Sequence, residues 1–115
     1  MERMTYDERC VTVAELIAIT DAAARVFPHL KGFQHVVGQR AMRLADMVAA
    51  DEPRENVRQA AINMRAWQTA APPAACTWWD NQLADLADSL TSAKERAELD
   101  ALAERLREDL AHLTF

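Results

Sequence analysis

The chain has 115 residues, enough for one hydrophobic core and too few for two. Its net charge of −5 argues against a general affinity for nucleic-acid backbone. The sequence contains no run of 18 apolar residues, the length that a helix needs to cross a membrane. Glycine occurs only twice while alanine is abundant, which favours helix over strand. We therefore predict an all-α, single-domain bundle of about five helices over residues 1–115, ending in a C-terminal αα-hairpin.

The first helix is predicted over 12–27, after a lead-in segment, 1–11, that has no clear period. Thr12 and Glu15 have the spacing of a capping box, and Pro28 cannot continue the helix. One face of this helix carries residues at helical spacing that we expect in the core, namely Val13, Leu16, Ile17, Thr20, Ala24 and Phe27.

The second helix is predicted over 33–50, after a connection in which Gly32 supplies a left-handed conformation. Gly38 lies inside this helix, where glycine is costly, and we interpret it as the close approach of another helix. Asp51 is the predicted N-cap of a third helix over 53–70.

The segment 66–79 contains all three tryptophans and no charged residue, which marks it as the centre of the core. Pro72 and Pro73 interrupt the helical pattern there, so the chain turns and a fourth helix is predicted over 77–90, capped by Thr77 or a neighbour.

The tryptophans differ in their expected environment. Trp67 and Trp79 continue the apolar stripes of their helices and are expected in the core. Trp78 points about 100° away from Trp79 on a helix, so it is the candidate for an exposed or interface-facing side chain.

A fifth helix is predicted over 93–113. Its leucine row is out of phase with that of 77–90, and Ser92 and Glu95 form a capping box at the break. We therefore favour an antiparallel hairpin over the alternative of one long curved helix. The row consists of Leu99, Leu102, Leu106, Leu110 and Leu113.

The sequence offers no metal or cofactor site that we can recognise. Asp109 and His112 lie one helical turn apart, but the other helices lack matching inward acids, so we expect His112 to face solvent. Two glycines cannot form a phosphate-binding loop, and Cys10 and Cys76 have no nucleophile signature. We therefore expect that the protein is not an enzyme and that it has no catalytic residue, no cofactor and no metal site.

Two surfaces remain as binding candidates, and each is also explained by an ordinary solvated helix face. The alternative function is a DNA-associated regulator, in which the second and third helices form a helix-turn-helix, although three acids close to its turn would meet the phosphates. Its nucleic-acid face would consist of Arg40, Arg43, Arg54 and Arg58.

The favoured candidate is the acidic C-terminal third, because residues 80–115 carry nine acids against four bases. Such a face can steer association with a basic surface on another protein. The predicted partner-binding residues are Trp78, Glu98, Glu104 and Glu108.

These patterns together predict a non-enzymatic protein-binding module that occupies the surface of a partner protein. An inhibitor, immunity or accessory protein would act in this way. A homodimer is a further alternative. Nucleic acid and membrane are not expected partners. Eleven arginines against two lysines suggest a bacterial or phage origin, and the absence of an apolar N-terminal segment suggests a cytoplasmic protein.

Overall fold

The computed structural model describes residues 3–67, 70–91 and 93–113. Within them the chain forms five α-helices and no strand, which confirms the predicted all-α class. The helices are α1 (Tyr6–Val26), α2 (Lys31–Ala49), α3 (Arg54–Asn63), α4 (Pro73–Ser89) and α5 (Ala93–Leu113).

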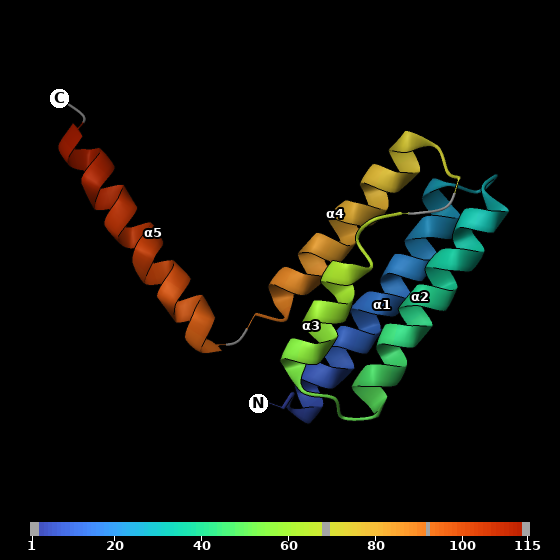
Figure 1. The fold of residues 1–115 in the computed structure, drawn as a ribbon, viewed down its shortest axis with the longest axis horizontal. Coiled ribbons are helices and arrows are strands. Elements are labelled where there is room, and N and C mark those ends of the chain that lie inside the picture. Colours follow the sequence, from blue (N-terminus) through green and yellow to red (C-terminus); the bar gives the residue numbers. More distant parts are fainter. Residues whose placement is uncertain (1–2, 68–69, 92, 114–115) are drawn as a thin grey trace.

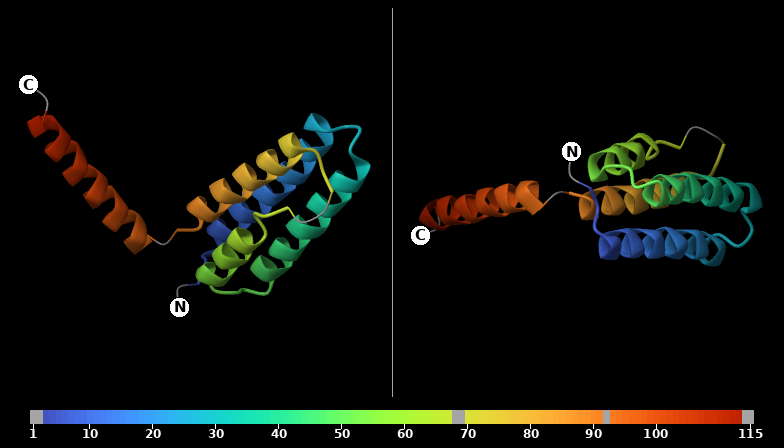
Figure 2. Two further views of the ribbon diagram at one scale, coloured as in Figure 1. Left: turned by 45° about the horizontal axis from the view of Figure 1, so that its top comes forward. Right: turned by 90° about the horizontal axis from the view of Figure 1, so that it is seen from below.

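Four of the helices pack together, and the fifth projects from them. In Figures 1 and 2, α1 to α4 lie side by side as a bundle. The main packing partners are α1 with α2 and α3 with α4, while α2 with α3 and α1 with α4 make smaller contacts.

α1 begins earlier than the sequence predicted. Thr5 is its N-cap and forms a capping box with Glu8, in which the Glu8 amide donates to Thr5 Oγ1 at 3.2 Å. Thr12, the predicted cap, is buried inside α1, and its hydroxyl donates to the Glu8 carbonyl at 2.8 Å. The lead-in prediction for 1–11 was therefore wrong from Tyr6 onward, because an earlier Thr-x-x-Glu pair starts the helix.

The buried face of α1 also differs from the predicted stripe. Thr12, Leu16, Ile19 and Ala23 are its buried residues. Ile17 is 57% exposed, because it lies about 200° around the helix from Ile19 and cannot share its face.

The two connections around α2 correct the predicted roles of Gly32 and Asp51. Gly32 lies in the first turn of α2, and no described glycine has a positive φ. Among the non-glycine residues that the structure describes, only Asp51 has a positive φ, 58°. It therefore makes the left-handed turn after α2. Pro53 is the N-cap position of α3, where its missing amide costs nothing.

α3 is shorter than the predicted 53–70 and ends at Asn63, so Trp67 lies outside the helix; residues 68–69 are outside the described part. α4 begins at Pro73, not near Thr77, because proline suits the first helical position.

Trp79 is the centre of the core, as predicted. It is 1% exposed, and its indole Nε1 donates to the Met64 carbonyl at 2.6 Å. This bond satisfies a carbonyl that the end of α3 would otherwise leave open. The Trp67 ring lies at 5.6 Å from the Trp79 ring, edge to face, and is half-buried.

The predicted break between α4 and α5 is confirmed, but their packing as an antiparallel hairpin was wrong. α5 keeps its predicted bounds and extends away from the bundle (Figure 1). The Cα radius of gyration is 17.0 Å, against about 13 Å for a compact chain of this length. The reason lies in α4, whose row of Trp79, Leu83, Leu86 and Leu90 is already buried in the bundle and leaves α5 no second apolar stripe.

Candidate protein-binding surface

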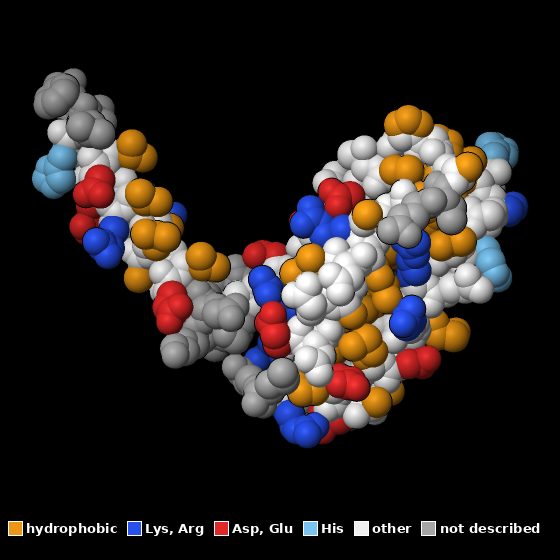
Figure 3. Space-filling view, viewed as in Figure 1, with side chains coloured by type: hydrophobic (Ala, Val, Ile, Leu, Met, Phe, Trp, Pro, Cys, Tyr) orange, Lys and Arg blue, Asp and Glu red, His pale blue; other side chains and the backbone are white. Residues whose placement is uncertain are grey.

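α5 presents leucine side chains to solvent, which makes it the first candidate surface. We call Leu99, Leu102, Leu106 and Leu110 the α5 leucine row. They are 51% to 62% exposed, and Figure 3 shows hydrophobic side chains gathered along one side of this helix. None of the α5 side chains that the structure describes is buried.

The spacing of the α5 leucine row keeps it on one side of the helix. Steps of three, four and four residues add up to eleven, which is three turns plus about 20°. Most of the stability of a helix in a protein comes from the packing of its apolar face against other elements. An apolar row of this kind is therefore typical of a helix that another surface covers.

The three predicted glutamates of α5 do not share one side with the leucines. Glu98, Glu104 and Glu108 are all exposed. Glu104 and Glu108 each stand two positions from Leu106, about 200° around the helix. Glu98 is about 100° from Leu99, so a surface that covers the leucine row meets Glu98 at its edge and leaves the other two glutamates in water.

Trp78 lies in a different part of the molecule from these glutamates. It is half-buried on the bundle, with its ring 5.7 Å from Phe27 and 6.0 Å from Phe33, both in edge-to-face geometry. It belongs to the first half of α4, whereas α5 follows the other end of α4. The structure therefore brings Trp78 into an aromatic cluster and does not join it to the acidic residues.

The four arginines of the alternative nucleic-acid face do not form one cationic surface. The side chain of Arg54 is 8% exposed and forms an ion pair with Glu8. Its hydrogen bond holds the pKa of Glu8 below the ordinary value of 4.5. Arg58 pairs with Glu55 at 3.0 Å.

Arg40 is also engaged inside the bundle. Its guanidinium carbon lies 4.6 Å from the Trp67 ring centroid and 5.7 Å from that of Trp79, and burial lowers the pKa of Arg40. Cation–π contact of this kind holds the charge against the core. Arg43 is thus the exposed member of the four.

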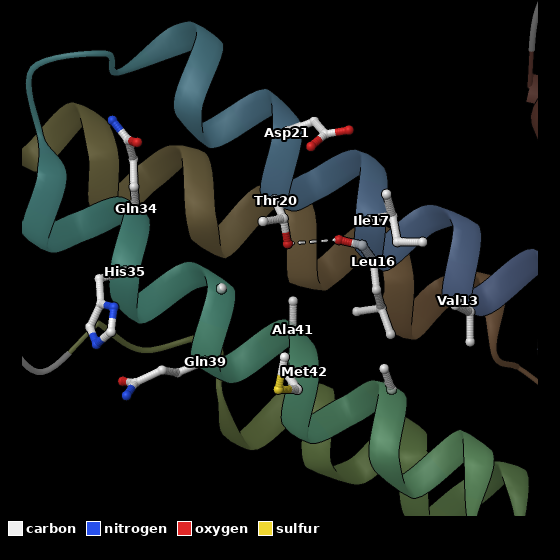
Figure 4. Close-up of a pocket in the computed structure, with 12 residues that line it drawn as sticks. Val13, Leu16, Ile17, Thr20, Asp21, Gln34, His35, Gln39, Ala41 and Met42 are labelled. Carbon is white, nitrogen blue, oxygen red and sulfur yellow. Dashed lines mark hydrogen bonds between the residues drawn. The ribbon is translucent and has the colours of Figure 1, made fainter.

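A groove between α1 and α2 is a second candidate surface, and the sequence analysis missed it. It has a volume of about 520 Å³. Figure 4 shows Val13 and Leu16 pointing from α1 toward α2, where Ala41 points back toward α1, and Ile17 and Met42 also line the groove. Ile17 and Met42 are 57% and 67% exposed, so this apolar lining is open to solvent.

Gly38 helps to keep this groove open. A Cβ atom placed there would meet no heavy atom within 4 Å, so the predicted close approach of another helix was wrong. A second hollow of about 400 Å³ shares Val13 and Ile17 with the first and extends it to Tyr6 and Cys10. The signal in the sequence was that α1 is apolar on more than one side, since Ile17 and Ile19 cannot face the same way.

The described residues contain no group of three or more His, Cys, Asp or Glu side chains arranged to hold a metal ion. Cys10 and Cys76 are both free thiols. No helix in the described part of the chain has the length and apolar character needed to cross a bilayer.

No family model, curated protein or solved structure matches this chain.

Proposed function

We propose that this protein is a non-enzymatic protein-binding module and that the α5 leucine row is its recognition element. The observation that supports this proposal is the exposure of four leucines on one side of a helix that projects from the bundle. An amphipathic helix binds a partner by placing such a row in an apolar groove, with anchors at intervals of three and four residues.

The charge of α5 suits this role. Glu98 and Asp100 flank the leucine row on the two sides of Leu99, and acids at the edge of a contact favour partners with a basic rim. Acting by occupation of a partner surface needs no catalytic group. An inhibitor, immunity or accessory protein of a bacterium or phage works in this way.

The test compares two pairs of substitutions on α5 in the full chain. Leu102→Glu with Leu106→Glu places acids in the leucine row. Ala97→Glu with Ala101→Glu adds the same charges on the opposite side of the helix, where both alanines are exposed. The immobilised wild type and both variants are incubated with an extract of the cells that produce the protein.

We expect a specific protein to be retained by the wild type and by the alanine variant, and to be lost from the leucine variant. Far-UV circular dichroism should show that the bundle of each variant is folded, because α5 contributes no described residue to the core. Equal retention on all three, or no retained protein on any of them, would refute the proposal.

A further inference from the structure

We infer that the groove between α1 and α2 is the docking site for α5 of a second copy of this chain, so that two copies exchange α5 reciprocally. This inference rests on the proposed function, since it uses the α5 leucine row as the binding element and names its partner surface.

The groove and the row match in length and in shape. The groove lining on α1 runs from Tyr6 to Asp21, about 22 Å at 1.5 Å per residue, and the leucine row spans about 17 Å. On α2 the lining includes Gly38, Ala41 and Ala45, spaced three and four residues apart. Small residues at this spacing leave holes that leucine side chains fill when two helices pack.

A second copy fits this groove better than the chain's own α5. α4 lies on the other flank of α1 from the groove, where Ser89 Oγ donates to Glu15 at 3.3 Å. From Ser89 to Ala93 the chain has four Cα-to-Cα steps and can span at most about 14 Å, which is little more than the diameter of one helix. A connection of this length cannot place the intact α5 of the same chain along the groove, on the far side of α1.

A reciprocal exchange buries twice the area of a single helix contact. Along the ~22 Å of the groove, a third of the side of a helix about 10 Å wide, together with an equal area of groove, amounts to roughly 460 Å². Two such contacts bury on the order of 900 Å², which is below the range of about 1,200–2,000 Å² for stable interfaces and is typical of a weak dimer. Direct pairing of the two α5 helices makes only one such contact.

The experiment measures the mass of the full chain in solution by sedimentation equilibrium, with one matched pair of variants for each surface. Leu106→Glu alters the row and Ala101→Glu is its control on the opposite side of α5. Ile17→Glu alters the groove, and Val11→Glu is its control, because both side chains are 57% exposed on α1 and Val11 lies outside the groove lining.

We expect the wild type and both controls to be dimers, and Leu106→Glu and Ile17→Glu to be monomers at the same concentration. Mixing the two monomeric variants should restore a weaker dimer with one chain of each. This follows because the intact groove of the first accepts the intact α5 of the second. Urea unfolding verifies that each variant is folded.

Two results would overturn the inference. A wild type that is monomeric at every concentration excludes the exchange, and a dimer that survives Ile17→Glu but not Leu106→Glu shows that α5 pairs with α5. In either case a partner still retained through the leucine row leaves the proposed function standing. If the leucine-row variants and their alanine controls behave alike in both experiments, the proposed function fails as well.

Discussion

Replacing Trp79 with alanine should remove the largest single contribution to the core. The side chain is 1% exposed, and a buried tryptophan removes about 150–250 Å² from water, or about 4–6 kcal/mol at 25 cal/mol/Å². Truncations of this kind cost about 3–5 kcal/mol. The lost bond to the Met64 carbonyl adds about 1 kcal/mol, so we expect a loss of about 4–6 kcal/mol in the free energy of unfolding.

The assay is urea unfolding followed by far-UV circular dichroism, with linear extrapolation to water. Trp79→Phe separates the two contributions, because it keeps an aromatic ring and removes the Nε1 donor. Trp78→Ala is the comparison, since Trp78 is half-buried and should cost clearly less. A loss below about 2 kcal/mol for Trp79→Ala, or equal losses at Trp78 and Trp79, would refute the proposed packing of the core.

Three further predictions follow from the fold. A chain that ends at Thr91 should unfold with a free energy within about 0.5 kcal/mol of the full chain in dilute solution, because no described core residue follows Leu90; a loss above 1 kcal/mol would contradict this. Gly38→Ala should stabilise the bundle by about 0.5–1 kcal/mol in thermal or urea unfolding, since the added methyl meets open space, and a destabilised variant would show that the site is closed. The lowered pKa of Glu8 means that the unfolded state binds more protons, so stability is present above pH 4.5 and falls as the pH drops through the folded-state pKa. Glu8→Gln should flatten this part of a stability profile between pH 7 and pH 3, and an unchanged slope would exclude the Glu8 contribution.

The helical class and the bounds of α5 could be predicted because they depend on local patterns. Leucine spacing located α5, and the phase change between the two leucine rows located the break before it. The start of α1 could not be chosen in the same way, since Thr5 with Glu8 and Thr12 with Glu15 have the same capping spacing. Tertiary packing, which buries Thr12, decides between them.

The surfaces were harder to predict, because periodicity shows which side of a helix is apolar and not what covers it. The α5 leucine row was read as the inner face of a hairpin, and only the structure shows it exposed. The sequence did not show that arginines of the predicted nucleic-acid face are already paired, because Arg54 forms its ion pair with Glu8, which is 46 residues away along the chain. The angle between Trp78 and Trp79 on a helix predicted that Trp78 faces outward. Phe27 and Phe33, which lie outside α4, cover part of its side chain.

The order of the chain has a consequence for how the protein is made. Leu90 is the last buried residue in the described part of the chain, and the 21 residues of α5 follow it. At about 5–20 residues per second, synthesis of α5 takes roughly 1–4 s after the last core residue has been added. The ribosome therefore completes the sequence of the bundle before the sequence of the leucine row. The residues of the bundle also leave the ribosome before the leucine row does, so the bundle is the first part of the chain that can fold.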